Sequence, residues 1–176
     1  MINRQQLLSD LQRLLRILET DLLNRSESSE VPEVGQALQA EYQKAKKAER
    51  TAQSYEEWRS DYITQIAAAW VLSCVFARFL EDNRLVEPPK IAGPGEQLGR
   101  ARDEHELYFR AHPTETDREY LLHVFGELAA LSGAKDVFGE HNPIHELPHW
   151  LSGDAAGELL KFFQKTIASS LSGGSN

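Results

Sequence analysis

The sequence has little of what an exported, disulfide-bonded protein carries. Among its 176 residues there is one cysteine, Cys74, which cannot form an internal disulfide and lies in an apolar run typical of a buried thiol. The first residues become polar from Asn3 onward, without the apolar core and small-residue cleavage site of a signal peptide. Both features favour a reducing compartment, and we expect a cytoplasmic protein.

Long apolar runs and a positive charge excess are lacking too. No uninterrupted apolar stretch reaches the roughly 20 residues that a bilayer-spanning helix needs, so we expect no membrane partner. The 19 Lys and Arg residues are outnumbered by 27 Asp and Glu residues, which gives a net charge of -8. Since nucleic-acid binding depends on neutralising phosphates, this balance excludes a uniformly basic DNA-binding surface, and any DNA contact must be local.

The motifs of several chemistries are also missing. There is no Gly-x-x-x-x-Gly-Lys phosphate loop and no Gly-x-Ser-x-Gly nucleophile elbow. Three histidines stand four residues apart, at 141, 145 and 149, but Pro143 and Pro148 interrupt the helix that would bring their rings to one metal. We therefore expect no catalytic, cofactor-binding or metal site in this chain.

What the sequence does contain is a helical apolar period along almost its whole length. We predict an all-α fold, a single-domain bundle of five to six helices around a buried central helix at about 55–83. The predicted helices cover about 3–24, 34–50, 55–83, 96–111, 116–133 and a last one that begins at Ser152 or Asp154. The domain spans 1–170, and the Gly- and Ser-rich residues 171–176 are a flexible linker or a non-native tail.

The central helix is apolar on more than one face, which is typical of a helix surrounded by others. We therefore predict that both Trp70 and Phe76 are buried. At its end, Arg78 precedes Glu81 and Asp82 by three and four residues, a spacing that favours a local ion-pair network.

One local basic group is the best candidate for a DNA contact. It consists of Lys44, Lys46, Lys47 and Arg50, with Arg59 a little further on. Positions 44, 47 and 50 step by three along the predicted helix and so share one broad face. Acidic residues are interleaved with them, at Glu41, Glu49, Glu56 and Glu57, so a solvated face with ion pairs is the alternative.

The run TQIAAAWVLSCVFARFLEDN, from Thr64 to Asn83, resembles the N-terminal region of the adenine-specific DNA methyltransferases of BREX-type phage-defence systems, particularly type 2. The opening residues 2–15 and the segments 141–144, 152–156 and 159–163 are similar as well. The related adenine methyltransferases of DISARM systems share this style of N-terminus.

This resemblance implies a parent chain several times longer, whose catalytic core uses S-adenosylmethionine. No catalytic or cofactor residue can be transferred to any position here, so the chain is expected to be a non-catalytic helical domain. Its implied partners are the rest of the methyltransferase chain and duplex DNA. The alternative is a protein-interaction module that recruits other defence proteins or is targeted by a phage inhibitor.

Overall fold

The computed structural model describes residues 3–171, with side chains as far as residue 165. Over this range it contains helices and turns and no strand, which confirms the predicted all-α fold. The α-helices are α1 (Arg4–Ser26), α2 (Pro32–Lys47), α3 (Tyr55–Asp82), α4 (Leu98–Ala111), α5 (Asp117–Ala129), α6 (Lys135–Phe138) and α7 (Gly153–Leu171). Two single 3-10 turns, η1 (Gly95–Gln97) and η2 (Pro143–His145), complete the described elements.

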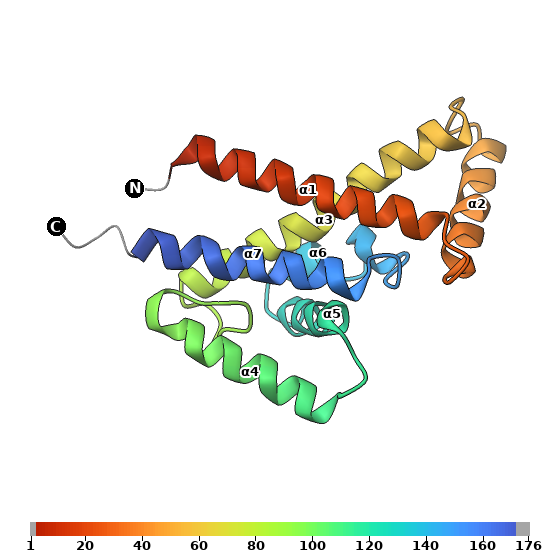
Figure 1. Cartoon of the computed structure of the whole chain (residues 1–176). Coiled ribbons are helices and arrows are strands. Elements are labelled where there is room, and N and C mark those ends of the chain that lie inside the picture. The colour runs from red at the N-terminus through yellow and green to blue at the C-terminus, as the bar shows by residue number, and fades with distance from the viewer. Residues whose placement is uncertain (1–2, 172–176) are drawn as a thin grey trace.

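The long helix α3 is the centre of the molecule. It crosses behind α1 and α7, which run in opposite directions and contact each other, so that α1 begins and α7 ends on the same side (Figure 1). Helix α5 packs against α7, and α4 lies at the lower edge (Figure 1). The side chain of Trp70, 1% exposed, packs on Phe125 with ring centroids 6.1 Å apart. The predicted burial of Trp70 and Cys74 is therefore confirmed.

Helix starts follow the capping residues that the sequence contains. Ser54 and Glu57 form a capping box at the start of α3, in which the backbone N–H of Ser54 donates to the Glu57 carboxylate at 3.0 Å. Thr116 and Glu119 repeat the arrangement at α5. Asn3 caps α1 with its side-chain oxygen, which accepts from two backbone amides of the first turn.

Helix α2 ends three residues earlier than predicted. It stops at Lys47, because Glu49 adopts a left-handed backbone with φ of 55° and the N–H of Arg50 turns back to the carbonyl of Ala45 at 2.9 Å. The expectation that Arg50 shares a helical face with Lys44 and Lys47 is wrong. No glycine marks this helix end, and the periodic pattern continues through it.

Helix α3 is not buried all round. Phe76, predicted to be buried, is 45% exposed, and it shares an outward face with other large apolar side chains. By length and composition α3 is apolar enough to cross a membrane, and half of its most apolar 18-residue window is buried inside the protein. The predicted tail at 171–176 begins with Leu171, which belongs to α7, and its remaining residues lie outside the described range.

Candidate functional site

The predicted DNA-contacting group lies at the end of α2 and just beyond it. Its four members, Lys44, Lys46, Lys47 and Arg50, are all exposed. Lys44 forms an ion pair with Glu41 at 2.8 Å, and the Lys46 ammonium lies 5.7 Å from the centre of the Tyr42 ring. Lys47 and Arg50 have no acidic partner within the described residues. In this group, the positive charge that has no carboxylate partner therefore lies at Lys46, Lys47 and Arg50.

Arg59 is separated from this group. Its guanidinium pairs with Glu27 at 2.9 Å, is only 13% exposed, and lies 5.3 Å from the centre of the Tyr55 ring. It also donates to the hydroxyl of Ser26 at the end of α1. Arg59 thus joins α3 to α1, and its charge is mostly offset inside the protein.

Beside the basic group runs a row of aromatic rings that the sequence reasoning missed. Neighbouring ring centroids are 5.3–6.3 Å apart along Tyr42, Tyr55, Trp58, Tyr62 and Trp150. The three members on α3 follow each other at intervals of three and four residues, which is the spacing that could have revealed the row. The row connects α2 and α3 with the segment before α7.

The last two rings of the row, Tyr62 and Trp150, are held by hydrogen bonds to other elements. The Trp150 indole N–H donates to the carbonyl of Leu22 at 2.8 Å, and the Tyr62 hydroxyl donates to the carboxylate of Glu146. Burial, followed by this hydrogen bond to Glu146, raises the pKa of Tyr62, so the phenol stays protonated and keeps donating. The rings are engaged in packing rather than presented for stacking on a base.

The segment from Arg78 to Asn83 has a structural role. Glu81, 2% exposed, accepts backbone N–H bonds from four successive residues of the loop after α3, at 2.7 to 3.0 Å. The donors are Lys90, Ile91, Ala92 and Gly93. A carboxylate with four amide donors is well compensated although it is buried.

Arg78 completes this arrangement from the preceding turn of α3. One guanidinium nitrogen donates to the carbonyl of Gly93 at 3.0 Å, and another pairs with Asp82. The network is therefore partly local, as predicted. Most of its hydrogen bonds, however, go to the loop residues 90–93 that follow α3. The side chains of Arg78 and Glu81 therefore both bind groups within the protein.

The three spaced histidines lie in the segment between α6 and α7. No group of three or more metal-ligating side chains occurs among the described residues. His145 contacts the carbonyl of Phe138 at 2.9 Å, and neighbouring Asn142 donates to the hydroxyl of Ser73 and to the carbonyl of Val137, each at 2.9 Å. Asn142 thus anchors η2 to α3, and it is 9% exposed.

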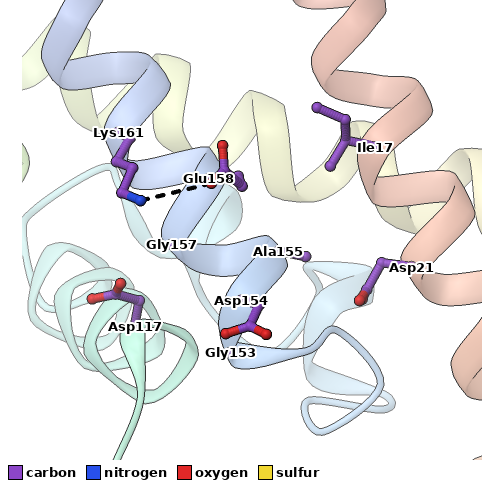
Figure 2. A pocket seen from close by; sticks show the side chains of 9 residues that line it. All are labelled: Ile17, Asp21, Asp117, Gly153, Asp154, Ala155, Gly157, Glu158 and Lys161. Atoms are coloured by element: carbon purple, nitrogen blue, oxygen red, sulfur yellow. Dashed lines mark ion pairs between the residues drawn. The ribbon is translucent and has the colours of Figure 1, made fainter.

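A hollow of about 530 Å³ lies between α1, the start of α5 and the first turns of α7. Figure 2 shows carboxylates on three sides of it, from Asp21, Asp117, Asp154 and Glu158. Asp21 accepts from the backbone N–H of Ser152 at 2.9 Å, and Asp117 contacts His105 at 2.6 Å. Lys161 also lines the hollow and pairs with Glu158 at 3.7 Å, which leaves an excess of carboxylates that favours neither phosphate nor DNA.

One apolar surface strip is not covered by any other part of the described residues. Four large apolar side chains follow one another on the C-terminal half of α3 and point outward, and we call them the α3 face. They are Leu72, Val75, Phe76 and Phe79, with exposed fractions of 53%, 37%, 45% and 58%. Of these four residues the sequence predicts burial for Phe76, because apolarity alone does not show which side of a helix is covered.

Comparison with known proteins identifies one kind of relative. No protein-family model and no solved structure matches the chain. The chain is 38% identical over 167 residues to a protein of Streptomyces coelicolor described as "Adenine-specific methyltransferase PglX". This similarity covers 94% of the chain but 14% of that protein. The chain is therefore homologous to a part of PglX and spans about one seventh of its length.

Proposed function

We propose that this chain is a non-catalytic helical domain of an S-adenosylmethionine-dependent DNA adenine methyltransferase in a bacterial anti-phage defence system. In that role it assists DNA engagement or assembly. The observation that carries the proposal is the similarity to PglX, which extends over 94% of the chain and only 14% of the relative. A domain-sized piece of a much longer enzyme fits an accessory role.

Three potentially reactive side chains of the described residues are engaged within the fold, which supports a non-catalytic role. Cys74 is fully buried, and burial raises the pKa of its thiol, which keeps it in the unreactive protonated form. Glu81 is occupied by four backbone amides, and the ring nitrogen of His145 by a carbonyl. A general acid or base needs a free position toward a substrate, and these groups have none.

The DNA-engagement role rests on Lys47 and Arg50. Both are exposed, close in sequence and without a partner carboxylate among the described residues, so they suit adjacent backbone phosphates. Lys44 and Lys46 flank them. The contact would position the enzyme without reading bases, because a few phosphate contacts carry no sequence information.

A protein-interaction module that recruits other defence proteins, or is targeted by a phage inhibitor, is the second candidate. It is favoured by the net charge of -8 and by the exposed α3 face. A purely electrostatic DNA contact would leave that apolar face unexplained.

A replacement experiment in the S. coelicolor relative tests the proposal. The 167 matched residues are deleted, or exchanged for the matched stretch of this chain, and transfer of labelled methyl groups from S-adenosylmethionine to DNA is measured. We expect the deletion to lose activity and the exchange to restore it. The isolated chain should neither transfer methyl groups nor bind S-adenosylmethionine in calorimetry. Cofactor binding by the isolated chain, or full activity of the deletion, would contradict the proposal.

A further inference from the structure

We infer that the α3 face is the surface by which this chain docks on the catalytic part of the methyltransferase. The inference rests on the proposed function and goes further, because it names the contact residues and the occupant. The occupant is a surface of the methyltransferase chain itself, with apolar side chains opposite Phe76 and Phe79 and a basic surround.

Charged side chains are absent along much of the outer side of α3. No Asp, Glu, Lys or Arg occurs between Asp61 and Arg78, and Arg78 itself is buried. The exposed positions change from Thr64 and Gln65 to the four large apolar side chains of the α3 face. Single exposed apolar residues are ordinary, whereas a contiguous apolar strip on one helix face marks an interaction surface.

The α3 face is small compared with the interface of a freely diffusing complex. Residues 72–79 span about 10 Å of helix axis. Such a strip is a small part of the roughly 800 Å² that each partner of a stable, freely diffusing complex buries. A contact of this size can hold a neighbouring domain of the same polypeptide, because a covalent tether raises the effective concentration of that neighbour to about the millimolar range. A second copy of this chain would lack that advantage.

The matching region of the S. coelicolor relative is a small part of a longer polypeptide. There it is 14% of a single longer protein, so a large remainder of the same polypeptide is available to cover an apolar strip. The net charge of -8 adds to this argument. A chain that holds DNA must be basic at its DNA-contacting surface, and an acidic accessory domain is complementary to such a partner.

Cysteine accessibility tests the inference directly. The native thiol of Cys74 is fully buried, so a cysteine introduced at the surface is the reactive one. Phe79→Cys reports on the α3 face, and Leu107→Cys on α4 is the matched control, since Leu107 is similarly exposed. The rate of maleimide labelling at each position is measured by peptide mass spectrometry in the isolated chain and in the exchanged S. coelicolor enzyme.

We expect both positions to label rapidly in the isolated chain. In the exchanged enzyme, labelling at 79 should fall at least tenfold while labelling at 107 stays unchanged. Equal labelling at 79 in an enzyme that still methylates DNA would overturn the docking surface and leave the accessory function intact. Full activity of the deletion variant would instead remove the proposed function.

Two further measurements cover the other occupants. Labelling at 79 in the isolated chain that slows with protein concentration would assign the face to a second copy. Slowing by vesicles of phosphatidylglycerol and phosphatidylcholine would assign it to a membrane. Either result overturns the inference. If the exchanged enzyme does not fold, hydroxyl-radical footprinting is done on the natural S. coelicolor protein. We expect the peptide aligned with residues 72–79 to be protected from oxidation there. Strong oxidation of its side chains would refute the inference.

Discussion

The carboxylate of Glu81, at the end of α3, accepts a 2.7 Å hydrogen bond from the backbone N–H of Ile91. Three neighbouring amides bind the same carboxylate. This contact explains how a loop with three prolines and two glycines between 84 and 97 keeps one conformation beside the core. It also predicts a strong effect of a nearly isosteric substitution.

Glu81→Gln should lower the free energy of unfolding by about 3–5 kcal/mol, as when one partner of a buried charged network is removed. The amide nitrogen would face backbone N–H donors, and Arg78 would lose a nearby negative charge. Urea unfolding followed by circular dichroism measures the change. Glu87→Gln is the control, because Glu87 forms a surface ion pair with Arg100 that is worth about 0–1 kcal/mol. Equal effects of the two substitutions would contradict the anchoring role.

Trp70→Ala and Phe76→Ala should differ sharply although both residues lie on α3. Trp70 is buried, and its truncation is expected to cost about 3–5 kcal/mol. Phe76 is 45% exposed, and its truncation should cost about 1 kcal/mol or less. The denaturation midpoints of the two variants measure this. A midpoint for Phe76→Ala as low as that for Trp70→Ala would mean that the outer side of α3 is covered in the isolated chain.

Gly153→Ala should be destabilising because a Cβ at this position would lie 2.6 Å from the Cβ of Thr116, where α7 crosses the start of α5. Such overpacking costs about 1–3 kcal/mol. Gly126→Ala, in the exposed middle of α5, meets no atom within 4 Å and should stabilise the protein by about 0.5–1 kcal/mol. Thermal unfolding distinguishes the opposite signs, and a stabilising Gly153→Ala would rule out close packing of α7 on α5.

Acid sensitivity should depend partly on Glu119. Burial tends to raise the pKa of this carboxyl, but hydrogen bonds from Thr116 and the pairing with Arg118 outweigh it and lower the pKa from 4.5 to about 2. A folded-state pKa below the unfolded value means that ionised Glu119 stabilises the protein above about pH 4.5, and that this stabilisation is lost as the pH falls toward 2.

Glu119→Gln keeps a capping side chain but removes this titration. The free energy of unfolding of the variant should therefore fall less than that of the original protein between about pH 4.5 and pH 2. Urea titrations at several pH values within this window compare the two. Parallel pH profiles would show that Glu119 is not held ionised by the fold.

Sequence patterns were sufficient for the fold because helical period and capping residues act over a few residues. The Ser54 and Glu57 box marks the start of α3 within one turn, and the apolar period continues to its end. The end of α2 was missed because Glu49 takes a left-handed conformation that only tertiary context reveals. No glycine stands there to indicate it.

The candidate surfaces were harder to predict because they depend on which side of each helix is covered. Phe76 and Trp70 are equally apolar in the sequence, and only the packing of α1, α5 and α7 shows that one is outside and the other inside. Arg59 looked like a member of the basic group until its contact with Glu27 placed it between α1 and α3. The loop bonds of Glu81 join residues nine to twelve apart, a separation that no helical spacing indicates.

The exposed basic residues at the end of α2 are the candidate DNA contact. If the end of α2 contacts duplex phosphates, the double charge reversal of Lys47 and Arg50 should weaken nonspecific binding by the exchanged S. coelicolor enzyme and leave its sequence preference unchanged. Each lost phosphate contact lowers the slope of log K against log salt by about 0.9, so the double variant should flatten it by roughly 2. Charge reversal of Lys44 alone should change the slope less, because Glu41 already offsets that charge. Fluorescence anisotropy with labelled duplex between low and physiological salt gives the slopes. An unchanged slope in the double variant would remove the end of α2 from the DNA interface and leave docking through the α3 face as the role that the structure supports.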